Sequence, residues 1–176
     1  LLNLPTTVVK ISDPKKKLRQ AYAFKEKAGT GPGIYHGLIE RKFLDELKEK
    51  RGSYFKDDNP DFDSGFSTLL YLDSYLQTNY PIFLSGHCAA SNSGSMNTKA
   101  SYHQGLSDFL DDSSSEVDEI MWTELENLVS IEAGLVSCMR RFLPEVNRNI
   151  SGKKIKLNKQ NIFNLVARGL QAGYDN

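Results

Sequence analysis

The sequence predicts a mainly α-helical protein, with five to six helices in an irregular bundle and at most a few short strands. Three observations support this fold class. Apolar residues recur at intervals of three and four along several segments, which is the spacing of one helix face. Residues that start or stop helices bracket these segments. Short β-branched or apolar runs occur near residues 6–11, 82–84 and 153–157, and short strands are expected only there.

Two helices are expected in the first third of the chain. The first begins at Asp13, which acts as the N-cap, carries Pro14 in its first turn and ends near Gly29. The second covers about residues 34–51, and Gly52 ends it. The residues on the apolar sides of these helices are Leu18, Ala21 and Tyr22 in the first, and Tyr35, Leu38, Ile39, Phe43, Leu44 and Leu47 in the second.

An acidic segment, residues 53–64, follows the second helix. Its aspartates suggest a calcium loop, but an EF-hand loop needs glycine at its sixth position and glutamate at its twelfth. Counted from Asp57, those positions hold Phe62 and Thr68. We therefore expect a solvated acidic turn and no metal site.

The remaining chain combines further helices with one long polar segment. A third helix is expected over residues 65–78, a long one over residues 113–143 and a last one over residues 159–172. Pro144 is expected to end the long helix, because proline cannot donate the helical hydrogen bond. Residues 85–101 are almost all small or polar, so they should form a flexible or functional loop.

The composition is that of a globular protein, and we expect a single domain over residues 1–176. No apolar run approaches the roughly 20 residues that a membrane helix needs, and the N-terminal residues lack the pattern of a signal peptide. Two cysteines, Cys88 and Cys138, are too few for a disulfide framework in a chain of 176 residues. We therefore expect an intracellular, cytoplasmic protein with reduced thiols.

The net charge is zero, but the charges are unevenly distributed. Residues 1–52 carry 12 basic and 6 acidic side chains, residues 53–132 carry 2 and 14, and residues 133–176 carry 8 and 2. One interpretation is that the basic ends fold against the acidic middle, or that all three segments are solvated faces. The functional alternatives are a basic surface for nucleic acid and an acidic surface for a basic partner. Carboxylates near helix starts suit the helix dipole, whereas two compact basic clusters have no such local role. These clusters are Lys15, Lys16, Lys17 and Arg19 near one end, and Lys153, Lys154, Lys156 and Lys159 near the other.

His87, Cys88 and His103 flank the polar segment and are the candidate catalytic residues. A cysteine nucleophile needs a base to form the thiolate, and histidine is the usual base. However, no known cysteine-hydrolase signature surrounds Cys88, and a buried thiol beside two exposed imidazoles explains the same residues. Adjacent ligands at positions 87 and 88 do not suit a structural zinc site, so no metal and no cofactor are expected.

Three functions are compatible with the sequence. The first is a helical protein–protein interaction or assembly module, which needs no catalytic residues and should expose an apolar patch. The second is nucleic-acid binding by the two lysine clusters, which requires both clusters to lie on one face. The third is a small Cys/His enzyme that uses residues 85–103. Because no convincing catalytic set is present, we expect a binding role before an enzymatic one, with a protein partner before nucleic acid and without a membrane span.

Overall fold

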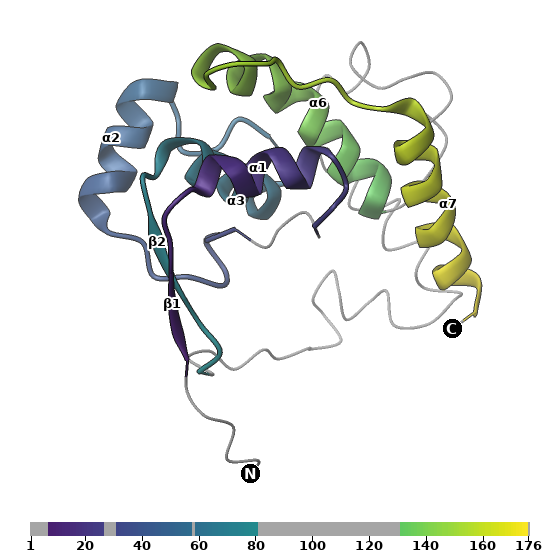
Figure 1. The fold of residues 1–176 in the computed structure, drawn as a ribbon, viewed down its shortest axis with the longest axis horizontal. Coiled ribbons are helices and arrows are strands. Elements are labelled where there is room, and N and C mark those ends of the chain that lie inside the picture. Colours follow the sequence, from purple (N-terminus) through teal and green to yellow (C-terminus); the bar gives the residue numbers. More distant parts are fainter. Residues whose placement is uncertain (1–6, 27–30, 58, 81–130, 176) are drawn as a thin grey trace.

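The computed structural model describes residues 7–26, 31–57, 59–80 and 131–175 (Figure 1). Within these ranges the protein has five helices and a single two-stranded sheet, so the predicted mainly helical fold class is confirmed. The elements in chain order are β1 (Val8–Ile11), α1 (Pro14–Tyr22), α2 (Arg41–Arg51), α3 (Pro60–Tyr71), β2 (Tyr75–Thr78), α6 (Ile131–Asn149) and α7 (Lys159–Asp175).

Helix α1 begins as predicted but ends earlier. The Asp13 carboxylate accepts a hydrogen bond of 2.9 Å from the Lys16 backbone N–H, and Pro14 occupies the first turn, where its missing N–H costs nothing. The helix ends at Tyr22 and not near Gly29, because Phe24 has a φ of 56° and turns the backbone out of the helix. This turn packs the half-buried Phe24 side chain against the core.

Helix α2 begins at Arg41, later than the predicted residue 34. Tyr35 and Leu38 are 59% and 85% exposed and precede the helix, so their expected place on its apolar side was wrong. The segment before α2 contains Gly37, and a glycine inside a helix costs about 1 kcal/mol. The end of α2 is as predicted, because Gly52 adopts the left-handed conformation with a φ of 83°.

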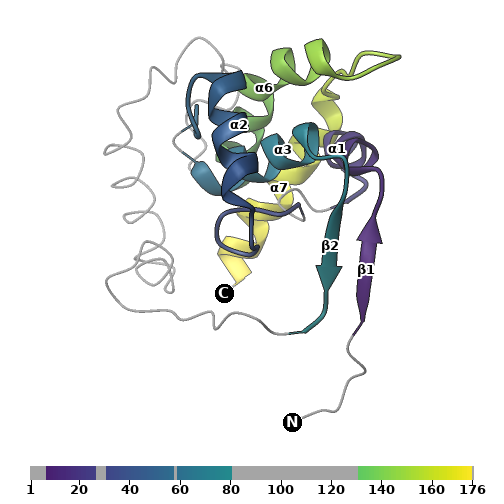
Figure 2. The same ribbon diagram turned by 90° about the vertical axis from the view of Figure 1, so that its left-hand side faces the viewer.

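Helix α3 spans Pro60–Tyr71 and therefore starts inside the predicted acidic loop and ends before residue 78. The residues after it form β2, which pairs antiparallel with β1, with Val8 opposite Thr78 and Ile11 opposite Tyr75. The local spacing of apolar residues does not distinguish β2 from the end of a helix. What makes these residues a strand is the pairing with β1, which lies far away in the sequence. Figure 2 shows the ribbon of β1 and β2 extending away from the helices.

Strand β1 confirms the short strand predicted at residues 6–11, whereas the one predicted at 153–157 is absent. There the Asn147 side chain takes both backbone groups of Ile155, accepting from its N–H at 2.8 Å and donating to its carbonyl at 3.0 Å. Backbone groups held in this way are not available for a ladder. The predicted strand at 82–84, the loop at 85–101 and the start of the long helix lie outside the described residues.

Helix α6 continues through Pro144 to Asn149, so the prediction that Pro144 ends it was wrong. Its apolar side continues beyond the proline, because Val146 and Ile150 are 0% and 5% exposed and belong to the core. The gain from burying these side chains offsets the lost backbone hydrogen bond. Figure 1 shows that α6 bends along its length.

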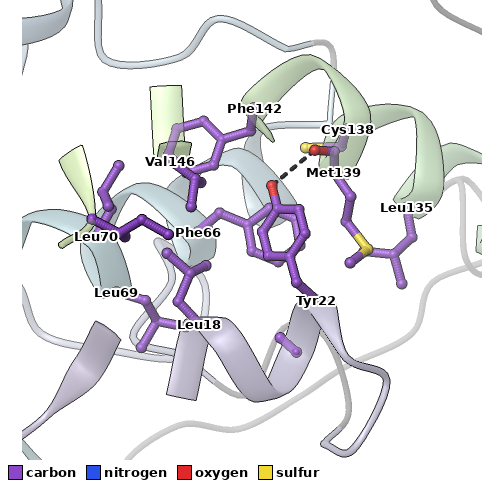
Figure 3. Close-up of a cluster of buried hydrophobic side chains, with 12 residues drawn as sticks. Leu18, Tyr22, Phe66, Leu69, Leu70, Leu135, Cys138, Met139, Phe142 and Val146 are labelled. Carbon is purple, nitrogen blue, oxygen red and sulfur yellow. Dashed lines mark hydrogen bonds between the residues drawn. The ribbon is translucent and has the colours of Figure 1, made fainter. Parts of the chain in front are cut away.

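The core lies between α1, α3 and α6 (Figure 3). Phe66 of α3 packs between two rings, at 5.8 Å from Tyr22 of α1 and 6.2 Å from Phe142 of α6, measured between ring centroids. The Tyr22 hydroxyl donates a 2.8 Å hydrogen bond to the Met139 carbonyl, so this buried polar atom is satisfied. A second cluster, of Val136, Ile162 and Val166, joins α6 to α7.

Candidate functional site

A buried ion-pair network holds α2 against α3 and α6. The Arg51 side chain is 0% exposed and donates to both Asp63 oxygens at 2.6 and 3.1 Å and to Glu145 Oε1 at 2.9 Å. Its guanidinium also lies 5.2 Å from the centre of the Phe142 ring. The planar guanidinium of arginine can bind two carboxylates and stack on an aromatic ring at the same time. This network fixes α2, whose other fully buried side chain is Leu47.

Tyr71 and Lys56 extend the network towards solvent. The Tyr71 hydroxyl donates to Glu145 Oε1 at 2.9 Å, and Lys56 Nζ lies 3.4 Å from Glu145 Oε2. Burial, together with the hydrogen bond and charge of Glu145, raises the pKa of Tyr71 to about 12. Glu145 therefore has three donors, and its negative charge is neutralised within the fold.

The acidic segment is not the solvated turn that the sequence suggested. Asp57 and Asp63 are 9% and 1% exposed, and Asp57 lies 3.3 Å from the Arg141 guanidinium of α6. Asp57 also accepts hydrogen bonds from the backbone and side chain of Asn59 at 3.0 and 3.1 Å. The two aspartates have structural roles, because each one binds an arginine from outside the segment.

The first basic cluster lies on α1. Lys15 and Lys16 are exposed and have no ion pair among the described residues, whereas Lys17 binds Glu26 at 3.0 Å. The first turn of α1 contains no acidic residue, although its dipole makes that end positive. Lysines there repel the dipole, so they reduce the stability of the helix. Asp13 is the nearby carboxylate, and the Lys16 backbone N–H occupies one of its oxygens.

The second basic cluster lies on the segment that joins α6 to α7. Lys153, Lys154 and Lys156 are exposed, and the Lys154 ammonium donates to the Asn147 carbonyl. The half-buried Ile155 and Leu157 anchor the segment to the core, and the Asn147 side chain fixes the backbone between them. Lys159 begins α7. The segment therefore has a defined course that presents lysines outwards.

Arg19 joins the two clusters. Its guanidinium donates to the Lys153 carbonyl at 2.9 Å and to the Ser151 carbonyl. Residues separated by more than 130 positions are thus hydrogen-bonded, which brings α1 next to the segment. A hollow of about 290 Å³ lies between them. We call the surface formed by Lys15, Lys16, Lys17, Arg19, Lys153, Lys154, Lys156 and Lys159 the basic surface.

A larger cleft adjoins the basic surface. It has a volume of about 790 Å³, and α1, α2, α3 and α6 all contribute to its walls. We call it the inter-helix cleft. Lys15 and Asn149 line both this cleft and the hollow on the basic surface, so the two depressions are neighbours. The charged side chains of the cleft are Lys15, Lys50, Lys56, Arg148, Glu46, Asp73 and Glu145.

The candidate catalytic residues His87, Cys88 and His103 lie outside the described residues, and their role stays a prediction. The other cysteine, Cys138, is a free thiol that is fully buried in the core. Burial, with a smaller effect from Asp57 and Asp63, raises its pKa far above the ordinary value. A thiol held protonated in this way is a structural residue and not a nucleophile.

The described ranges contain no group of three or more histidine, cysteine or carboxylate side chains placed to hold a metal ion. Within the same ranges, no helix is both long and apolar enough to cross a bilayer. Comparisons with models of protein families, with curated proteins and with solved structures found no match to this chain. What the described part offers chemically is therefore a set of exposed cationic side chains beside a polar cleft.

Sequence reasoning placed the lysines of the basic surface but missed the cleft and the ion pairs. One signal was available for Arg51, since it continues the four-residue spacing of Phe43 and Leu47 and so belongs to the buried side of α2. Glu145 gave no signal, because the helix was expected to end one residue before it. Tyr71 and Arg148 come together only in the folded chain.

Proposed function

We propose that this chain is a binding module that holds nucleic acid on its basic surface. The observation that carries this proposal is the bridge from Arg19 to the carbonyls of Ser151 and Lys153. Nucleic-acid binding by two clusters requires that both lie on one face, and this bridge supports that arrangement because it brings α1 next to the backbone of Ser151 and Lys153. The function can operate without catalytic groups, and four lysines of the basic surface, Lys15, Lys16, Lys153 and Lys156, make no ion pair among the described residues.

The chemistry of the basic surface suits a phosphate backbone. Lysine ammonium groups are point charges that attract phosphates, and each contact releases condensed counterions. Lys15, Lys16, Lys153 and Lys156 are exposed and make no ion pair among the described residues, so they are available for such contacts. Arg19 is occupied by backbone carbonyls, and we assign it a positioning role.

The zero net charge of the chain is the sum of unlike parts, because residues 81–130 carry 8 acidic side chains and one basic one, and the rest carries 14 acidic and 21 basic side chains. The buried carboxylates Asp57, Asp63 and Glu145 each bind an arginine, and their charges are neutralised inside the fold. Within the described residues, Asp13 and Glu26 are the carboxylates bonded to the first basic cluster, Asp13 through the Lys16 backbone N–H and Glu26 through the Lys17 ammonium.

The test is a titration of a fluorescent oligonucleotide, followed by anisotropy at several salt concentrations. The affinity should fall linearly on logarithmic axes, with a slope of about −0.9 for each phosphate contact on duplex DNA or −0.7 on a single strand. The double variant Lys16→Gln/Lys156→Gln should weaken binding and make the slope shallower by about two contacts. Lys42→Gln is the matched control, because Lys42 is an exposed lysine of α2 outside the basic surface.

A salt-independent affinity would overturn the proposal. So would a control variant that weakens binding as much as the double variant does, because the contacts would then not belong to the basic surface. The Arg19→Gln variant adds a further measure: it should weaken binding by loosening the segment that carries Lys153, even though Arg19 itself contacts no phosphate.

A protein partner is the second candidate, and the ribbon of β1 and β2 favours it. Val8, Val9 and Leu76 are 61%, 54% and 70% exposed, and the ribbon has only two strands among the described residues. Two-stranded ribbons are marginally stable alone, and open strand edges pair readily with an extended chain. Sedimentation equilibrium would separate the two candidates, since Val8→Lys should abolish self-association through the ribbon and leave nucleic-acid binding unchanged.

A further inference from the structure

The inter-helix cleft lies where a strand bound to the basic surface would pass. The hollow on the basic surface and the cleft share Lys15 and Asn149, so a backbone that follows the lysines reaches the mouth of the cleft. The volume of about 790 Å³ falls in the range of small-ligand sites. Its lining is rich in charged groups, which indicates a polar ligand.

The charged groups of the cleft suit the two ends of a nucleotide. Lys15, Lys50 and Arg148 come from three different helices and have no ion pair among the described residues, so they can receive a phosphate. Glu145 is already occupied by Arg51, Tyr71 and Lys56. The remaining carboxylates, Glu46 and Asp73, would repel a phosphate but can accept hydrogen bonds from the amino groups of a base.

Phe43 supplies the surface on which a base could stack. It is half-buried in the wall of the cleft, yet it packs against neither of the hydrophobic clusters of the core. The other aromatic ring of the cleft, Tyr71, already has Lys50 Nζ 5.9 Å from its centre. An aromatic side chain in the wall of a cleft beside cations is a feature of single-strand binding sites, because bases stack on it whatever their sequence.

We propose that the inter-helix cleft receives one unpaired nucleotide, with its base on Phe43 and its phosphate near Lys50 and Arg148. This inference rests on the proposed nucleic-acid binding and narrows it to single strands. A base in a duplex is paired and stacked, and it must leave the helix before it can enter a lateral cleft. The cleft therefore favours a single strand over a duplex of the same sequence.

The test compares a single-stranded oligonucleotide with its duplex, for the wild-type chain and for Phe43→Ala. The wild type should bind the single strand more tightly than the duplex. Phe43→Ala should weaken single-strand binding by about tenfold and leave duplex binding unchanged, because it removes stacking and no charge. Phe55→Ala is the matched control, since Phe55 is an aromatic residue that is 42% exposed outside the cleft.

Lys50→Gln provides a second variant on the exposed side of α2, so the test does not depend on how Phe43→Ala folds. It should lower single-strand affinity and make the salt dependence shallower. Equal wild-type affinity for single strand and duplex, or unchanged single-strand binding in both variants, would overturn the cleft site and leave the basic surface standing. The absence of salt-dependent binding to either oligonucleotide would overturn the proposed function and the cleft site together.

Discussion

Replacing Arg51 with methionine should remove most of the contacts that hold α2 in place, and it should therefore lower the free energy of unfolding. Methionine matches the length of the arginine stem but removes the guanidinium that binds Asp63 and Glu145. It also removes the 3.0 Å hydrogen bond to the Tyr54 carbonyl, which fixes the segment after α2. Neither carboxylate can move to water without displacing the helix that carries it, because their side chains are only 2% and 9% exposed.

The expected loss follows from the burial of the stranded charges. Removing one partner of a buried ion pair costs about 3–5 kcal/mol, because the remaining charge is left uncompensated in the interior. Partial compensation comes from the Lys56 backbone N–H, 2.9 Å from Asp63, and from the Lys56 ammonium beside Glu145. We therefore expect a loss of about 3 kcal/mol, a large part of the 5–15 kcal/mol that stabilises a typical domain.

The assay is urea unfolding followed by circular dichroism, with linear extrapolation to water. Arg41→Met is the matched control, because Arg41 binds Asp45 on the same helix at 3.0 Å but is 80% exposed. Exposed pairs contribute little, so this variant should lose far less stability. Adding Asp63→Asn and Glu145→Gln to Arg51→Met should recover part of the loss. Equal losses for Arg51→Met and Arg41→Met would refute the assigned role of the network.

Two further predictions concern buried titratable groups. The pKa of Tyr71 is raised to about 12 in the folded chain, whereas a tyrosine of the unfolded chain titrates near its ordinary value of about 10. The folded state therefore holds this proton longer, and its contribution is complete below pH ~10 and lost as the pH rises to ~12. Urea unfolding at increasing pH should show a decline that is less steep in Tyr71→Phe, and identical declines would contradict the assignment. Cys138, in a chain that carries Cys88→Ser, should react with an aromatic disulfide reagent only as fast as the protein opens, because its buried thiol stays protonated. A rate in native buffer equal to that of a free thiol would show that the site is accessible.

The helix ends that the sequence predicted correctly are those determined by one or two local residues. Asp13 and Pro14 start α1 through a cap and a fixed φ, and Gly52 ends α2 through its left-handed backbone. Both effects act within one turn of the helix, so they can be recognised without the rest of the fold. The basic residues of the surface were also found, because a run of lysines is visible whatever it folds against.

The errors have distant causes. Pro144 does not end α6, because Val146 and Ile150 continue the side of the helix that faces the core. Residues 75–78 form a strand, because β1 lies beside them. A sequence pattern describes each segment separately, whereas burial depends on which segments meet, so tertiary contacts override these local signals.

Arginines and lysines have different places in the described part of the fold. Arg51 and Arg141, from the two basic end segments, enter the fold and bind Asp63 and Asp57 of the acidic middle. The basic ends thus do fold against the acidic middle, but through arginines, whose forked donors suit a buried carboxylate. The lysines of the basic surface remain at the exterior, where an ammonium keeps its hydration. These buried pairs contain two arginines and three carboxylates, so they change the balance of the remaining charges little. The excess of basic residues in the rest of the chain is balanced by residues 81–130, which carry 8 acidic side chains and one basic one.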